Sequence, residues 1–162
     1  MKFISEKVIE EVIGAFEQSE KLESKIRKDF QETQPILFSY LFSDSFKFLT
    51  ESEKEFLLYL ALLIFETSRR ENDLSDPIDS ETINQYEEAN WAIFNENNKG
   101  SFRQRLDTFF QDYPQEDLLA LVEDSMTDEE EEDDYFNLTK EGKELIFVGL
   151  KSLIDSLHYS ID

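Results

Sequence analysis

Apolar residues recur at every third or fourth position over long stretches of this chain, which is the spacing of one face of an α-helix. The first stretch covers residues 8–26, and Lys and Arg gather at residues 21–28, where the negative end of a helix dipole favours cations. Only four glycines and three prolines interrupt the chain, which favours long helices over short strands joined by turns. A mixed fold would need a strand at residues 46–49 or 146–148, and the spacing disfavours both. The pattern predicts an all-α protein.

Residues 56–65 differ from the other stretches because they are apolar on every side, with the sequence Phe-Leu-Leu-Tyr-Leu-Ala-Leu-Leu-Ile-Phe. A helix in an outer layer would show polar residues at every third or fourth position here. Thr50 and Glu53 precede the run with the spacing of a capping box, in which each side chain binds the backbone of the other residue. We therefore expect a buried central helix over about 51–70. Six or seven helices in all should pack around it as a single domain, 1–162.

Capping residues predict the boundaries of several other helices. Asp79 or Ser80 is placed to begin one helix, and Ser101 with Gln104 forms a second candidate capping box. Thr139 is placed to cap the last helix, which we expect to bury one broad apolar face against the rest of the protein. That face consists of Leu145, Ile146, Leu150, Leu153, Ile154 and Leu157.

The formal net charge is −22 over 162 residues, and most of it comes from two stretches without Lys or Arg. Residues 71–98 hold eight carboxylates and residues 112–136 hold twelve. Such a surface repels nucleic-acid backbones and anionic membranes, and it attracts basic protein surfaces. We therefore expect a basic protein partner and no direct nucleic-acid binding. Membrane insertion is not expected either, because residues 56–65 are about half of the ~20 apolar residues that a bilayer span needs.

The chain contains no cysteine, which excludes disulfides, thiolate catalysis and cysteine-ligated metal sites. This composition fits a reducing cytoplasm. The first residues carry charges and show no apolar stretch with a cleavage site. Fifteen Phe, six Tyr and one Trp are enough for a packed core, whereas a disordered acidic chain would be poor in aromatics. We expect a soluble, cytoplasmic, globular protein.

Seven consecutive carboxylates form the most acidic segment, inside a polar stretch over about 125–136 that we expect to be an exposed loop. An EF-hand begun at Asp124 would need Gly at its sixth position and Glu at its twelfth, but Glu129 and Tyr135 stand there. The run is therefore interpreted as a solvated loop, with contact to a basic partner as its functional alternative. Its residues are Asp128, Glu129, Glu130, Glu131, Glu132, Asp133 and Asp134.

Residues suited to catalysis are scarce. The single histidine, His158, lies near the end of the last predicted helix, where a partly cationic ring would meet the negative end of the dipole. Glu66 follows the apolar run and would need Arg69 or Arg70 as a partner if it is buried. The chain has no phosphate-binding glycine loop, no serine nucleophile motif and no zinc-binding histidine motif. We therefore predict no enzymatic activity, no cofactor and no metal site.

Trp91 and Phe94 lie in the acidic, base-free stretch that ends at residue 98. Exposed aromatic residues of this kind anchor protein interfaces. Large aromatics are more often buried, so the core is the preferred interpretation. Both residues nevertheless remain candidates for partner binding.

These observations favour a non-enzymatic, cytoplasmic interaction module whose acidic face meets a basic protein partner. A nucleic-acid mimic or immunity-type inhibitor is the main alternative, and it would require carboxylates at phosphate-like spacing on one ordered surface. A metal-dependent enzyme that uses Asp and Glu is the weaker alternative, and it would require a pocket with at least three converging carboxylates.

Overall fold

The computed structural model describes residues 1–127 and 138–162. These residues contain eight α-helices and one short 3-10 helix, with no strand among them, so the all-α prediction is confirmed. The helices are α1 (Glu6–Gln18), α2 (Glu20–Thr33), α3 (Pro35–Tyr40), the 3-10 helix η1 (Asp44–Phe46), α4 (Glu51–Glu71), α5 (Ser80–Glu96), α6 (Phe102–Phe110), α7 (Glu116–Thr127) and α8 (Lys140–Ser160).

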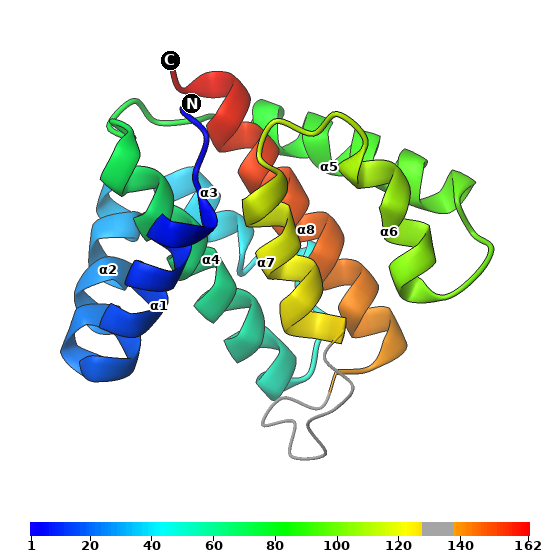
Figure 1. The fold of residues 1–162 in the computed structure, drawn as a ribbon, viewed down its shortest axis with the longest axis horizontal. Helices are drawn as coiled ribbons and strands as arrows, with labels where there is room; N and C mark the ends of the chain where they lie inside the picture. The colour runs from blue at the N-terminus through cyan, green and yellow to red at the C-terminus, as the bar shows by residue number, and fades with distance from the viewer. Residues whose placement is uncertain (128–137) are drawn as a thin grey trace.

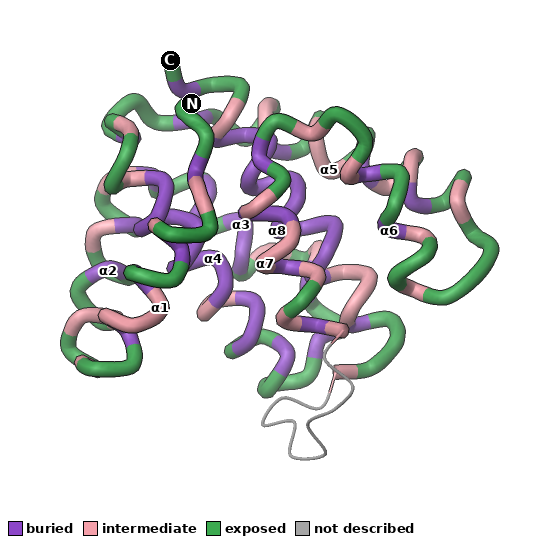
Figure 2. Tube along the Cα trace, in the orientation of Figure 1, coloured by how far each residue is buried: buried purple, intermediate pink, exposed green. Residues whose placement is uncertain are grey.

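Two long helices, α4 and α8, pack against each other in the middle of the protein (Figure 1). The α1–α2 pair covers one side of α4, while α5 and α7 pack on α8. Figure 2 shows that the buried residues concentrate along these two helices. The predicted central helix is therefore present as α4, but it shares the central position with α8.

The last helix is more deeply buried than its apolar pattern indicated. Every residue of 146–157 is buried, including the polar residues Lys151 and Asp155, so α8 does not bury only one broad face. The reason is that α4, α5, α7 and η1 all pack around α8. Lys151 and Asp155 would face solvent if α8 were covered on one side only, but α5 covers them.

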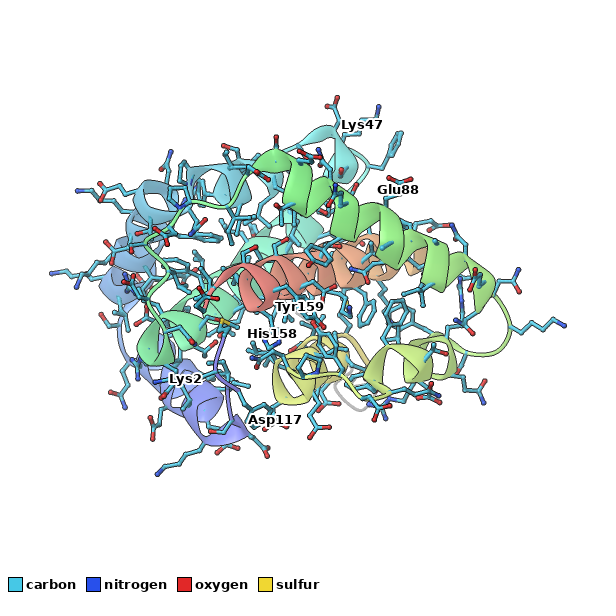
Figure 3. All side chains as sticks on the ribbon, turned by 90° about the horizontal axis from the view of Figure 1, so that it is seen from above. Lys2, Lys47, Glu88, Asp117, His158 and Tyr159 are labelled. Atoms are coloured by element: carbon cyan, nitrogen blue, oxygen red, sulfur yellow. The ribbon has the colours of Figure 1, made fainter. Side chains whose placement is uncertain are left out.

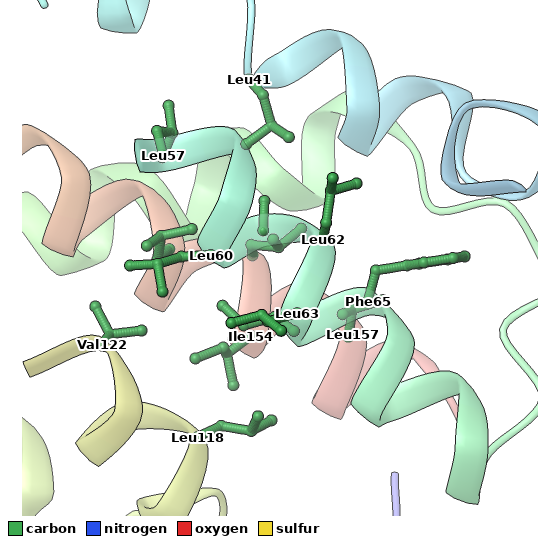
Figure 4. Packing of buried hydrophobic residues seen from close by; sticks show 14 of the residues in the cluster. Leu41, Leu57, Leu60, Leu62, Leu63, Phe65, Leu118, Val122, Ile154 and Leu157 are labelled. Carbon is green, nitrogen blue, oxygen red and sulfur yellow. The ribbon is translucent and has the colours of Figure 1, made fainter. Parts of the chain in front are cut away.

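The core joins α4, α7 and α8 through aliphatic side chains (Figure 4). Leu60 and Leu63 of α4 lie beside Ile154 of α8, and Leu118 of α7 closes the cluster from the other side. Each of these side chains is almost fully buried. Removing one such side chain from water contributes about 1.5–3 kcal/mol, so this contact is a main source of the stability of the fold.

The first helical stretch is split into α1 and α2, whereas the apolar pattern predicts one helix through residues 21–28. The break falls at Ser19, which has an extended backbone and accepts a hydrogen bond from the backbone N–H of Leu22 at 3.3 Å. The chain then turns back, so that α1 and α2 lie side by side against α4 (Figure 1). This arrangement buries both Phe16 and Ile26. The split raises the number of α-helices to eight.

The predicted loop at 125–136 begins too early. Ser125 and Thr127 belong to α7, where their hydroxyls donate to the carbonyls of Leu121 and Glu123 four residues earlier. Met126 is buried, and this apolar contact explains why the helix continues. The acidic run itself lies outside the described residues.

Within the described part of the chain, no helix combines the length and the apolar character that crossing a bilayer requires.

Candidate functional site

A groove of about 450 Å³ lies between α1 and α7, and its walls combine acidic and apolar side chains. Ile9, Ile13 and Leu121 supply apolar surface along it. Ile9 is buried, while Ile13 and Leu121 keep part of their surface accessible. The groove therefore offers an apolar floor to a ligand from outside. Its remaining lining residues are Glu6, Glu10, Asp117, Ala120, Asp124 and Ser125.

Hydrogen bonds fix the two helices at one end of the groove. Asp117 Oδ2 accepts from the backbone N–H of Glu6 at 2.9 Å, so a side chain of α7 satisfies the first turn of α1. The buried Gln115 accepts from the N–H of Ile4 at 3.0 Å and donates to the carbonyl of Lys2 at 2.8 Å. Figure 3 shows Asp117 close to this N-terminal segment. The groove thus has a defined geometry at this end.

The lining of the groove carries four carboxylates and no Lys or Arg. Glu6 and Glu10 are exposed and make no ion pair with any residue in the described ranges. Asp124 pairs with Arg103 at 3.3 Å, but both side chains are largely exposed, and such a pair contributes little stability. The groove can therefore accept cationic groups at its rim and apolar groups at its floor.

The acidic run follows the groove directly in the sequence. Asp124 and Ser125 line the groove, α7 ends at Thr127, and the seven carboxylates begin at the next residue. The run, Asp128 to Asp134, was the main sequence-based candidate and lies outside the described residues. The groove was missed because its apolar residues belong to the helical stripes that were assigned to the core.

The two aromatic candidates lie elsewhere, on α5. Phe94 is only 1% exposed, and the guanidinium of Arg105 lies 3.8 Å from its ring centroid. Trp91 is half-buried and meets Phe94 edge to face, with the ring centroids 5.9 Å apart. Neither residue lines the α1–α7 groove. Phe94 is therefore part of the core, as preferred, and Trp91 lies at the margin of the core.

Several carboxylates of the stretch 71–98 have structural partners. Asp79 caps α5 by accepting from the N–H of Thr82 at 2.9 Å, and this hydrogen bond lowers the pKa of Asp79. Glu87 accepts hydrogen bonds from the hydroxyls of Tyr40 and Ser45. Asp79 and Glu87 are therefore engaged in contacts within the protein. Fewer carboxylates of this stretch are free to meet a partner than the composition indicated.

A buried polar cluster, which no sequence motif predicts, joins α5, α8 and the segment before α7. Lys151 Nζ lies 2.7 Å from Asp155 Oδ2 and 3.2 Å from Asn90 Oδ1. Tyr113 donates to Asp155 Oδ1 at 2.6 Å, and Ser152 accepts from Asn90 at 3.0 Å. Each of these polar groups has a partner within the cluster, which indicates a structural role. The signal in the sequence was a set of polar residues inside an otherwise apolar helix.

Burial changes the ionisation of this cluster. It lowers the pKa of Lys151, although the nearby Asp155 carboxylate opposes the change. Burial also raises the pKa of Tyr113, and the charge and hydrogen bond of Asp155 act in the same direction. The tyrosine therefore keeps its proton and continues to donate to Asp155 at ordinary pH.

Two further predictions from single residues have different outcomes. Glu66 is buried and pairs with Arg69 at 2.6 Å and with Arg70 at 3.5 Å, which confirms the predicted helix-end salt bridge. His158 was expected to be partly cationic. Burial and the amino group of Met1 instead lower its pKa, despite Asp155, and favour the neutral ring. The Met1 nitrogen, rather than His158, donates to carbonyls at this end of α8.

In residues 1–127 and 138–162, no three His, Cys, Asp or Glu side chains come together in a way that could hold a metal ion. Comparison with family models, curated proteins and solved structures found no match for this chain. The site is therefore interpreted from its geometry alone.

Proposed function

We propose that this protein is a non-enzymatic, cytoplasmic interaction module that binds a basic, amphipathic segment of a partner protein in the α1–α7 groove. The single observation that carries the proposal is the composition of that groove, which has four carboxylates around an apolar floor and no Lys or Arg in its lining.

The two parts of the groove would contribute differently to binding. An amphipathic helix that enters a groove places apolar side chains at three- and four-residue spacing on the floor. Ile13 and Leu121 offer accessible apolar surface for such anchors. The carboxylates of Glu6 and Glu10 would meet Lys or Arg at the edges of the same helix. Affinity would then come mainly from the floor, and specificity and association rate from the rim.

The net charge of −22 supports a basic partner over an acidic one. Long-range attraction raises the association rate of oppositely charged proteins and weakens as salt rises. In this proposal the run Asp128–Asp134 adds to the attraction, since it follows α7 in the sequence. Neutralising it with Asn and Gln is expected to slow association and to leave the fold intact.

A direct test uses a synthetic amphipathic peptide with Lys on one helical face and Leu on the other. NMR amide shifts should change along α1 and α7, including Ile13 and Leu121, and binding should weaken as salt rises. Ala120 lines the groove, so Ala120→Arg should block it sterically and reduce its negative charge. Ala92 is exposed on the acidic helix α5 and provides the matched control, Ala92→Arg.

The peptide should bind the Ala92→Arg protein as it binds the parent protein, and its affinity for the Ala120→Arg protein should fall at least about tenfold, the loss typical of an interface anchor. Equal affinity for both variants, or shifts spread over all acidic surfaces, would show nonspecific charge attraction and would overturn the proposal.

A further inference from the structure

Residues 35–49, which contain α3 and η1 and are called the α3–η1 surface below, carry the two most exposed phenylalanines of the described residues. Phe48 is 82% exposed and Phe42 is 59% exposed, and Ile36 on the same segment is 37% exposed. Single exposed apolar residues are common on protein surfaces, but several large ones on one short segment mark an interaction surface. Figure 3 shows the neighbouring Lys47 extending from this segment away from the body of the protein.

Two cations accompany these rings. The guanidinium carbon of Arg27 lies 5.9 Å from the ring centroid of Phe42, and Lys47 Nζ lies 5.2 Å from that of Phe48. Neither cation makes an ion pair with a carboxylate of the described residues. Although the chain has a large excess of acid, no described carboxylate occupies these two cations, and both are available for a ligand.

A groove of about 420 Å³ begins at Phe42. Arg27, Lys47 and Lys54 contribute cations to its walls, and Leu58 contributes apolar surface. The hydroxyl oxygen of Ser43, which also lines the groove, is shielded from solvent and has no hydrogen-bond partner among the described residues. The groove therefore presents the cations Arg27 and Lys47 next to apolar and aromatic surface, with the unpaired Ser43 hydroxyl beneath them.

Acidic residues limit the total charge that this groove can accept. Asp44, Glu51 and Glu55 also line it, and Glu51 lies 3.9 Å from Lys54. A highly charged anion would be repelled by these carboxylates. A single carboxylate beside an apolar side chain fits better, because the planar guanidinium of Arg27 can bind it through two parallel hydrogen bonds.

We propose that this α3–η1 surface is a second docking site, which takes a partner-protein segment with a carboxylate next to an apolar or aromatic side chain. The proposal is independent of the α1–α7 groove, because the two sites share no lining residue. A second copy of this chain is a poorer occupant, since two molecules of net charge −22 repel each other.

The test titrates the protein with a synthetic peptide built from Asp, Leu and Phe, with a matched peptide in which Asn replaces Asp. The acidic peptide should shift NMR amide signals of Arg27, of residues 41–48 and of Leu58, while leaving Ile13 and Leu121 unchanged. The Asn peptide should bind more weakly at the same residues. Preferential binding of the Asn peptide, or shifts outside this surface, would overturn the proposal.

Variants separate a specific site from general apolar contact. The variant Phe48→Ser should lower the affinity for the acidic peptide at least about tenfold. The double variant Arg27→Gln with Lys47→Gln should lower it by a similar factor. Phe3, which is 50% exposed on the N-terminal segment, provides the matched control Phe3→Ser, which should bind normally. Equal losses in Phe3→Ser and Phe48→Ser would contradict the proposal. Concentration-dependent dimerisation through residues 41–48 without peptide would identify a second copy as the occupant and would also overturn it.

Discussion

Lys151 and Asp155 form an ion pair inside the protein, with Nζ and Oδ2 2.7 Å apart and side chains that are only 8% and 4% exposed. The two residues lie one helical turn apart on α8, in a part of the helix that α5 covers. Asn90 of α5 hydrogen-bonds to both members of the pair. The pair therefore ties the orientation of α8 to that of α5 by directional contacts, in a region where the other contacts are mostly apolar.

Removing one member of this pair should be costly, because it leaves the other charge buried without its partner. We expect Lys151→Met and Asp155→Leu each to lower the free energy of unfolding by about 3–5 kcal/mol. The double variant should lose less than the sum of the two. Urea denaturation of the two single variants and of the double variant measures these changes in the free energy of unfolding. The exposed pair of Lys28 and Glu32, 4.0 Å apart, is the control, and Lys28→Met should cost less than about 1 kcal/mol.

The central position of α4 predicts large losses from truncation of its side chains. Leu60 and Leu63 are each 1% exposed, so replacement by Ala removes buried carbon atoms and leaves a cavity. We expect each replacement to cost about 2–5 kcal/mol of unfolding free energy. Thermal and urea denaturation measure the loss. Values below about half a kcal/mol, typical of surface positions, would contradict the central placement of α4.

Two helical glycines should respond in opposite directions to Ala. A Cβ on Gly149 would lie 2.5 Å from Cζ of the buried Phe46, and the ring has little room to move. Gly149→Ala should therefore destabilise the protein by about 1–3 kcal/mol. A Cβ on Gly14 meets nothing within 4 Å, so Gly14→Ala should gain up to about 1 kcal/mol from helix propensity. A stabilising Gly149→Ala would show that η1 does not pack on α8 in this way.

Glu53 should couple stability to acid pH because it supports the first turns of two helices. Its carboxylate accepts from the N–H of Thr50 at 3.0 Å, within the capping box of α4, and from the N–H and hydroxyl of Thr139 at 3.0 and 2.9 Å. Burial by itself would raise the pKa of Glu53, but these hydrogen bonds outweigh it and lower the pKa.

The lowered pKa of Glu53 determines how this residue makes stability depend on pH. A carboxyl whose pKa is lower in the folded protein contributes stability above its unfolded pKa, near 4.3, and loses it as pH falls further. Glu53→Gln should therefore narrow the difference in melting temperature between pH 7 and pH 3 that the parent protein shows. The exposed Glu55 provides the control Glu55→Gln, which should leave that difference unchanged. Equal effects of the two variants would place Glu53 outside the two helix caps.

Tyr40 and Tyr113 should resist ionisation at alkaline pH. Burial raises the pKa of each phenol, and the nearby carboxylates Glu87 and Asp155 raise them further. A group with a raised folded pKa contributes stability that is complete below its unfolded pKa, near 10, and decreases as pH rises above it. Ultraviolet titration should show the tyrosinate signal of these two residues only when the protein unfolds. Complete titration of all six tyrosines in the folded protein would contradict this.

Local signals in the sequence were sufficient to predict where several helices begin. The capping boxes of Thr50 with Glu53 and of Ser101 with Gln104 are both present, and Asp79 and Thr139 cap the helices predicted for them. These contacts join residues three positions apart, so their geometry depends on the local backbone alone. The apolar run 56–65 likewise determined that the middle of α4 is buried, and only Leu58 and Tyr59 of this run keep part of their surface accessible.

The tertiary structure decided which helices share the centre and where the accessible sites lie. Lys151 and Asp155 have the polarity of a surface pair, and only the packing of α5 over α8 places them inside the protein. Ile13 and Leu121 are ordinary members of apolar stripes, and only the approach of α1 to α7 places them in one groove. The physical reason is the same in both cases. A helical period specifies which side chains share a face, but the neighbour of that face comes from distant parts of the chain.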